Sequence, residues 1–245
     1  MKDTKSYLSK IVQDMPDSGI KDFFDVANTM EGALSLGVGE PDFPTPEHVR
    51  EAAIASIKKG DTKYTDNRGT VELRAAAADY LTKFDLHYDK QDEILITMGA
   101  SEGIDLALRT LVNPGEEVLV AEPSYVSYIP CIELCGGVPV SLKLRAENKF
   151  RLTREQLEEK ITEKSKVLLI SYPNNPTGAI MEKEDLEAIA EVVKEHDLFV
   201  ITDEIYAELT YGKKHVSIAS LPGMYERCVV LNGFSKAFAM TGWRM

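Results

Sequence analysis

Short runs of apolar residues, separated by segments with helical periodicity, are the feature that most restricts the fold of this chain. The runs are bounded by turn-forming residues and lie at 94–96, 118–120, 167–170, 198–201 and 228–231. Continuous apolar runs of this length are typical of strands buried on both faces of a parallel sheet. Between them, apolar residues recur at helical spacing at Leu186, Ile189, Ala190 and Val193. The alternation predicts an α/β domain with a mostly parallel sheet over about residues 47–245.

The first part of the chain lacks this alternation. Residues 1–44 are irregular, and prolines at 41, 44 and 46 exclude a long helix there, because proline lacks an amide hydrogen and fixes φ. The length of 245 residues suits one large domain, or one and a half. We therefore predict an N-terminal segment, residues 1–46, followed by a large domain, residues 47–245.

Composition excludes several functions. Forty acidic residues against 28 basic ones give a net charge of −12, which argues against a nucleic-acid surface. No apolar run is as long as a membrane span, and the first ten residues lack a hydrophobic signal core, so we expect a cytoplasmic protein that binds no membrane. The cysteines at 131, 135 and 228 have no ligand or redox spacing, so we expect buried thiols and no metal site.

One lysine lies in an apolar, aromatic stretch near the end of the chain. A second cation, Arg244, follows Lys236 eight positions later, and the large neighbours are Phe234, Phe238, Met240 and Trp243. A lysine that is partly desolvated beside another cation loses proton affinity. Such an amine is a usable nucleophile for Schiff-base chemistry.

Unusual residues also follow three of the predicted strands, at the edge where parallel α/β sheets bind ligands. Small residues at 98–103 lead into a helix, which makes either an anion site or only a tight turn. Residues 172–178 form either a turn or a rigid loop that presents Asn175 to a ligand. Asp203 ends a buried strand, where it either caps the next helix or holds a cationic group such as a protonated pyridine nitrogen.

Taken together, seven motifs in order resemble the class I/II aminotransferases, pyridoxal-5′-phosphate enzymes of fold type I related to aspartate aminotransferase. The resemblance covers nearly the whole chain and is carried by residues 37–46, 64–69 with Leu73 and Arg74, 98–103, 122–125, 174–178, 203–206 and 235–244. It implies a three-layer sandwich with a mostly parallel central sheet as the cofactor domain. The N-terminal segment would then belong to a smaller domain that is incomplete in this chain.

The resemblance also implies roles around the cofactor ring. Lys236 would form the Schiff base with pyridoxal 5′-phosphate, and Asp203 would pair with the pyridine nitrogen. Tyr206 and Asn175 match donors to the phenolate oxygen of the ring, and Tyr125 matches the aromatic residue that stacks on its face. Lys236, Asp203 and Tyr206 are thus the predicted catalytic residues.

Further residues would hold the phosphate and the substrate. Tyr64 matches a tyrosine that reaches the phosphate in the neighbouring subunit, which implies a homodimer with shared active sites. Gly39 matches a backbone contact near the substrate carboxylate, and Asn175 would also contact the substrate. The phosphate cradle of the same chain would consist of Ala100, Ser101, Ser235 and Arg244.

The implied activity is transfer of an amino group from an L-amino acid to a 2-oxo acid, with 2-oxoglutarate as the expected acceptor and ping-pong kinetics. In that reaction the amine of Lys236, released by the substrate, would act as general base at Cα. Alternatives within the same fold are a C–S lyase or a decarboxylase. A non-catalytic domain that only binds the cofactor is the alternative from another class.

The resemblance stops where the chain stops. Relatives continue beyond the position of Met245, and their further region supplies the arginine that binds the substrate carboxylate. We interpret Arg68, Arg74 and Arg109 as surface or structural residues rather than as that arginine. We therefore expect the 245-residue chain alone to bind the cofactor poorly and to transaminate little.

Overall fold

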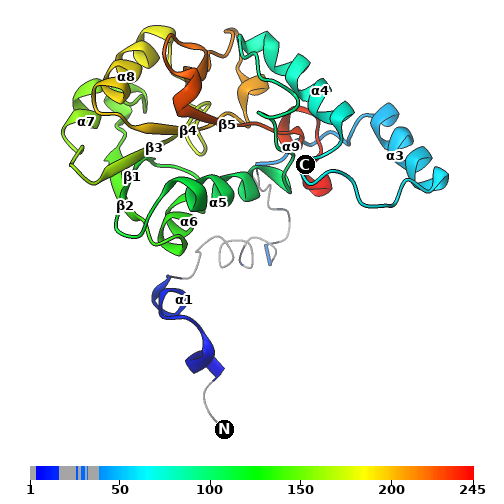
Figure 1. Ribbon diagram of the computed structural model, residues 1–245, viewed down its shortest axis with the longest axis horizontal. Helices are drawn as coiled ribbons and strands as arrows, with labels where there is room; N and C mark the ends of the chain where they lie inside the picture. The colour runs from blue at the N-terminus through cyan, green and yellow to red at the C-terminus, as the bar shows by residue number, and fades with distance from the viewer. Residues whose placement is uncertain (1–3, 17–25, 27–28, 31, 33–38) are drawn as a thin grey trace.

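A parallel five-stranded sheet forms the centre of the protein (Figure 1). The computed structural model describes residues 4–16, 26, 29–30, 32 and 39–245. The strand order is β2-β1-β3-β4-β5. The strands are β1 (Glu117–Glu122), β2 (Val138–Lys143), β3 (Ser165–Ser171), β4 (Phe199–Asp203) and β5 (Cys228–Leu231).

Helices cover both faces of this sheet. On one face, α5 (Gly99–Leu111) and α6 (Tyr128–Leu134) share a buried apolar cluster with the strands. On the other face, α7 (Arg154–Glu158) and α8 (Lys183–Glu195) share a second cluster with them. Figure 1 shows the two pairs of helices on opposite sides of the strands. The prediction of an α/β fold with helices on both faces of a parallel sheet is confirmed.

The remaining described elements are short helices and two longer ones before the sheet. The longer helices are α3 (Glu47–Lys59) and α4 (Val71–Leu81). The short ones are η1 (Thr4–Tyr7), α1 (Lys10–Asp14), η2 (Thr82–Phe84), η3 (Ala146–Asn148), η4 (Ala207–Leu209), η5 (Ile218–Ser220), η6 (Tyr225–Arg227), α9 (Phe234–Ala237) and η7 (Thr241–Trp243). Within the described part of the chain, none of these helices has the length and apolarity needed to cross a bilayer.

The amphipathic helix expected from the spacing of its apolar residues is α8. Its predicted stripe of Leu186, Ile189, Ala190 and Val193 is buried against the sheet. The opposite side of α8 carries charged residues, so the helix gains most of its stability from burying one face.

One predicted strand is wrong, and one strand was not predicted. Residues 94–96 do not form a strand: the Ile96 amide donates to the Arg68 carbonyl oxygen (3.0 Å). The same segment and β5 line an apolar cavity of about 640 Å³, and the described sheet ends at β5. The unpredicted strand is β2, whose apolar pattern is interrupted by Pro139 and Ser141. Proline is tolerated there because β2 lies at the edge of the sheet.

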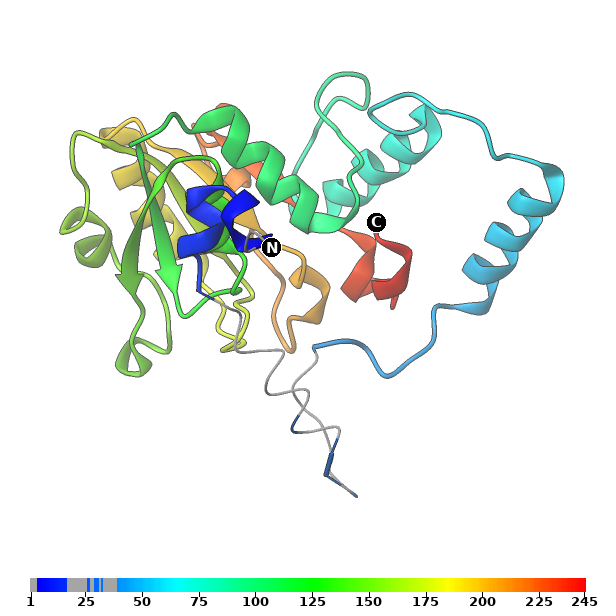
Figure 2. The same ribbon diagram turned by 90° about the horizontal axis from the view of Figure 1, so that it is seen from below.

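Helix α3 projects from the main body. Figures 1 and 2 both show α3 at the periphery, away from the strands, and none of its residues is buried. The proposed boundary between residues 46 and 47 stays a prediction. Gly37 and Val38, which begin the first matching motif, lie outside the described residues.

Candidate active site

Asp203 is a buried carboxylate at the carboxyl end of β4. Its side chain is 5% exposed and accepts a hydrogen bond from the Tyr128 hydroxyl (2.7 Å) and one from the Ile205 amide (3.1 Å). Burial raises the pKa of Asp203; the two hydrogen bonds lower it, and the neighbouring Glu204 carboxylate raises it further. A buried carboxylate held in this way is prepared to bind a cationic partner.

Lys236 lies in α9, which begins three residues after β5. Its Nζ donates to the carbonyl oxygen of Gly39 and lies 5.7 Å from the centre of the Tyr206 ring. Burial lowers the pKa of the Lys236 ammonium; Glu40 and Tyr125 oppose this change, while the Arg244 guanidinium adds to it. Desolvation and a second cation are the two causes that the sequence predicted, and desolvation is the larger.

Tyr206 and Tyr125 lie close to these two groups. Burial raises the pKa of the Tyr206 hydroxyl, and the charge of Asp203 and the proximity of Tyr125 raise it further. The Tyr125 ring packs edge-on against Tyr128, with 5.6 Å between ring centres. The structure therefore brings Tyr206 and Tyr125, from two loops, to the neighbourhood of Asp203 and Lys236.

A candidate anion site lies where α5 begins. The first-turn amides of an α-helix have no partner within the helix, and here they belong to residues that include Ala100 and Ser101. Gly99 has φ +71°, and a Cβ there would lie 2.7 Å from Nη2 of Arg244. The Arg244 guanidinium thus lies against the start of α5, where its charge adds to the helix dipole.

Ser235 and the last residues of the chain complete this corner. The Ser235 side chain is 8% exposed, and its hydroxyl donates to the Met245 carbonyl oxygen (3.3 Å). Ser235 directly precedes Lys236, so the predicted phosphate cradle and the predicted nucleophile share one short segment.

The motif before α3 packs against the segment that follows Lys236. Trp243 Nε1 donates to the Thr45 hydroxyl (3.0 Å), and the Thr241 hydroxyl donates to Glu40 (3.1 Å). A cavity of about 530 Å³ lies between these two segments. A Cβ on Gly39 would lie 3.7 Å from the Tyr206 hydroxyl, so Gly39 stands beside both Tyr206 and Lys236.

Asn175 and Tyr64 are placed differently from the residues above. Asn175 is half-buried in the loop after β3. The buried Asn174 holds this loop: the side-chain amide of Asn174 donates to the Pro123 carbonyl oxygen (3.2 Å), and Asn174 Oδ1 accepts from Thr177. β3 pairs with β4 in register, Ser171 opposite Asp203, so this loop leaves the sheet at the same edge as Asp203. Tyr64 is fully exposed in the loop between α3 and α4.

Comparison with known proteins agrees with this arrangement. The family model described as aminotransferase class I and II matches residues 31–245. This chain belongs to that family. It is 53% identical over 241 residues to the YugH protein of Bacillus subtilis, covering 98% of this chain and 62% of that protein.

Two further members of the family have names that state an activity. Aromatic-amino-acid aminotransferase 2 of Thermococcus litoralis is 47% identical over 240 residues, covering 97% of this chain and 62% of the relative. The structure of Thermus thermophilus aspartate aminotransferase with maleate superposes with a TM-score of 0.91 at 38% identity, covering 97% of this chain and 63% of that one. The chain thus spans about three fifths of the length of the relatives it matches.

Class I and II aminotransferases use pyridoxal 5′-phosphate, and the described residues fit that cofactor. An amine with a lowered pKa is present in Lys236, and a buried carboxylate is present in Asp203. At Gly99, a side chain larger than hydrogen would displace the Arg244 guanidinium from the helix start that suits a phosphate. These are the features that an aldehyde, a pyridine nitrogen and a phosphate require.

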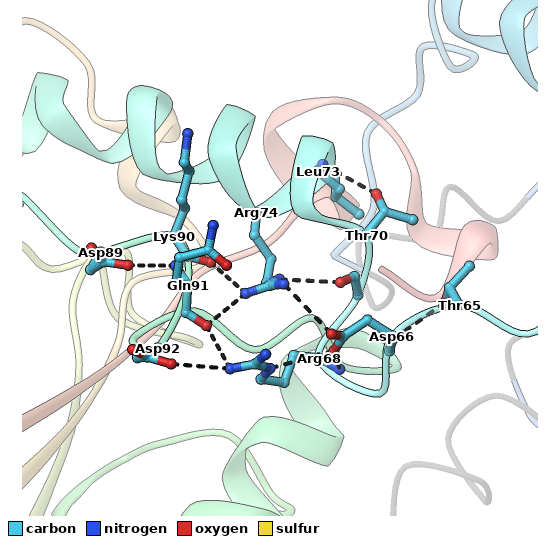
Figure 3. A network of polar contacts seen from close by, with 11 residues as sticks. Thr65, Asp66, Arg68, Thr70, Leu73, Arg74, Asp89, Lys90, Gln91 and Asp92 are labelled. Carbon is cyan, nitrogen blue, oxygen red and sulfur yellow. Dashed lines mark hydrogen bonds and ion pairs between the residues drawn. The ribbon is translucent and has the colours of Figure 1, made fainter.

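The three arginines interpreted as structural or surface residues of this aminotransferase chain are paired within it. Arg74 is fully buried and donates to the carbonyl oxygens of Gly69, Lys90 and Gln91 (Figure 3). Arg68 is more exposed and pairs with Asp66 and Asp92 in the same network. On α5, Arg109 pairs with Asp105 one turn earlier (2.8 Å). Their interpretation as residues outside the substrate site agrees with these contacts.

Sequence reasoning missed two residues that contact or adjoin Asp203. Tyr128 lies three positions after Tyr125 and 75 positions before its hydrogen-bond partner Asp203, so only the fold reveals the contact. Glu204 gives no local signal because an acidic pair at a strand end resembles a solvated helix start, yet its side chain is buried.

Proposed function

We propose that the full-length protein transfers the amino group of an L-amino acid to a 2-oxo acid with pyridoxal 5′-phosphate as cofactor. The observation that carries this proposal is that a partly desolvated amine, Lys236, and a buried carboxylate, Asp203, both lie near Tyr206. When bound, the cofactor supplies an aldehyde and a ring that accepts electrons.

The predicted site residues have different roles around the cofactor ring. Lys236 would hold the cofactor aldehyde through Nζ, and its amine, when free, would take up the proton from the substrate Cα. Asp203 would accept a hydrogen bond from the ring nitrogen, and its negative charge would favour the protonated form of that nitrogen. Tyr206 and Asn175 would donate to the ring oxygen, and Tyr125 would pack against the ring.

The other end of the cofactor is a phosphate dianion. The amides of Ala100 and Ser101 at the start of α5, the Ser235 hydroxyl and the Arg244 guanidinium would bind this phosphate, because all are donors or cations around one corner of the structure. The carbonyl oxygen of Gly39 accepts from Lys236 Nζ, so the Gly39 backbone lies where it would contact the substrate near its carboxylate.

The second half of the reaction uses a different 2-oxo acid, with 2-oxoglutarate as the proposed acceptor. Because the amino group stays bound to the enzyme while the first product leaves and the second substrate enters, the kinetics are expected to be ping-pong. Two of the relatives named above are an aromatic-amino-acid aminotransferase and an aspartate aminotransferase. Because their names differ in the amino donor, a screen of amino acids would identify the donor of this protein.

A homodimer with shared active sites is part of the proposal. Tyr64 is fully exposed in a loop anchored by Arg68 and Arg74, which suits a residue that acts in a second subunit. The exposed Ile54 and Ile57 of α3 lie on the same projecting region.

The test is covalent labelling followed by an assay on the full-length protein. Borohydride reduction of the cofactor-loaded protein should fix the cofactor on Lys236, as peptide mass mapping would show. Lys236→Ala should abolish both the label and amino transfer to 2-oxoglutarate, whereas Lys183→Ala, on the exposed start of α8, should change neither. A label on another lysine would refute the site, and release of ammonia with pyruvate in place of amino transfer would refute the reaction.

A further inference from the structure

Glu204, the residue after Asp203, is a second buried carboxylate that the proposed reaction does not use. Its side chain is 1% exposed. Its Oε1 accepts from the Thr202 hydroxyl (3.0 Å) and the Ser217 hydroxyl (2.7 Å), and its Oε2 lies 2.8 Å from Nε2 of His215. Every one of these partners is itself buried.

Stability alone does not explain such a cluster. Removing a carboxylate from water is expensive, and well-packed apolar residues in the same place are often equally stable or more so. The Phe84 ring packs edge-on against His215, with 5.5 Å between ring centres. A polar cluster in this setting fixes one arrangement of the chain, because each of its members has only one set of partners.

The arrangement that it fixes is the loop that carries Tyr206. Successive side chains at a strand end point to opposite faces of the sheet. Asp203 accordingly reaches Tyr128 of α6, while Glu204 reaches His215 and Ser217 at the returning end of the loop. The loop 205–214 is thus closed at its two ends by Glu204.

The backbone of Glu204 is fixed as well. Its amide donates to the Leu231 carbonyl oxygen at the end of β5 (2.8 Å), and its carbonyl oxygen accepts from the Ala207 amide (2.9 Å). Glu204 therefore links three segments of the site. They are the end of β4, which carries Asp203, the end of β5, which leads to Lys236, and the turn that carries Tyr206.

We propose that Glu204 is a positioning residue of the cofactor site: through His215 and Ser217 it closes the loop 205–214 and so holds Asp203 and Tyr206 where they meet the cofactor ring. This inference rests on the proposed function. Glu204 itself touches neither cofactor nor substrate, because it points to the opposite face of the sheet from Asp203.

The experiment compares variants of the full-length protein by cofactor affinity, by the pH dependence of the absorption of bound pyridoxal 5′-phosphate, and by thermal stability without cofactor. Glu204→Ala removes the closure. Glu204→Gln keeps its shape and offers a second variant if the first folds poorly. Leu157→Ala, a fully buried residue of α7, is the matched control that destabilises the core without touching the loop.

Both Glu204 variants should weaken cofactor binding by about tenfold or more, the scale known for residues that orient the ligands of a metal. They should also move the pH at which the absorption changes, because Asp203 and Tyr206 set the charge of the ring. Leu157→Ala should lower the melting temperature and leave both cofactor readouts unchanged. Glu204 variants that behave like Leu157→Ala, losing thermal stability alone, would overturn the inference.

The two levels of the proposal fail in distinguishable ways. If the unmodified full-length protein does not bind pyridoxal 5′-phosphate, the proposed function is refuted and this inference with it. If the unmodified protein binds the cofactor through Lys236 and the Glu204 variants bind it equally well with the same pH dependence, only the positioning role is refuted.

Discussion

At the scale of single residues, the site consists of ionisable groups held away from their ordinary pKa values. Burial raises the pKa of Asp203 and lowers that of Lys236, so each group is destabilised in its charged form until a partner binds. Perturbed pKa values of this kind are typical of functional sites because binding a ligand relieves the cost of burial. The same burial makes the cofactor-free protein less stable than its fold allows.

Asp203→Asn should therefore stabilise the cofactor-free protein at neutral pH while abolishing tight cofactor binding. The pKa of Asp203 is higher in the folded state than in the unfolded state. The protonated side chain therefore stabilises the fold fully at pH values below the unfolded-state pKa, and this contribution is lost as pH rises through the folded-state pKa. A tenfold difference in proton affinity between the folded and unfolded states corresponds to about 1.4 kcal/mol. The gain in unfolding free energy should appear at about pH 7–8 and vanish near pH 4, as urea denaturation at several pH values would show.

The exposed Asp79→Asn on α4 is the control for that comparison, because it makes the same chemical change at the surface of the protein. A stability difference between Asp203→Asn and the parent protein that stayed constant from about pH 4 to pH 8 would contradict the assignment of a raised pKa.

At the scale of elements, one buried arginine ties the start of α4 to the segment that precedes α5. Arg74 donates to the carbonyl oxygens of Gly69, Lys90 and Gln91, so it joins the start of α4 to the segment before α5 (Figure 3). Gly69 is required in this contact: its φ is +92°, and a Cβ would lie 2.5 Å from Cγ1 of Ile96. The loop carrying Tyr64 ends in this network.

Arg74→Lys should lower the unfolding free energy by about 3 kcal/mol, because lysine cannot reach three carbonyl oxygens and leaves buried acceptors unpaired. Arg68→Lys is the matched change in the same network. It should lower the unfolding free energy by less than about 1 kcal/mol, since Arg68 is partly exposed. Urea denaturation measures the unfolding free energy of both variants, and equal decreases would show that burial of the arginine does not decide how much stability is lost.

At the scale of the whole molecule, the parallel sheet and the projecting α3 have different relations to solvent. The sheet is covered on both faces, whereas Ile54 and Ile57 of α3 are 51% and 69% exposed. Apolar side chains on a projecting helix, next to the fully exposed Tyr64, suit contact with a second copy of the chain.

If the full-length protein is the dimer proposed above, replacing Ile54 and Ile57 together by aspartate should convert it to a monomer at micromolar concentration, as sedimentation equilibrium would measure. Two buried charges at an interface should weaken association by at least about a hundredfold, since about 1.4 kcal/mol is a factor of ten. Ala52→Asp introduces the same kind of charge on the opposite side of α3 and should leave the dimer intact. A double variant that remains dimeric would place the interface elsewhere.

Much of this architecture follows from local sequence pattern. Continuous apolar runs predict four of the five strands, because a strand covered on both faces needs no polar side. The stripe on α8 is likewise visible in the sequence. β2 was not predicted because an edge strand can include Pro139 and polar residues. Residues 94–96 were wrongly predicted as a strand because an apolar run does not by itself provide a hydrogen-bonding partner.

The sequence by itself determined the fold class and the family, and it pointed to the proposed amine and carboxylate at 236 and 203, since these depend on short motifs and their order. Only the tertiary structure decided which residues support them. Tyr128 reaches Asp203 across 75 positions, and His215 and Ser217 reach Glu204 from the far end of a loop. Such contacts depend on how strands and loops meet at one edge of a sheet, which no local pattern of residues contains.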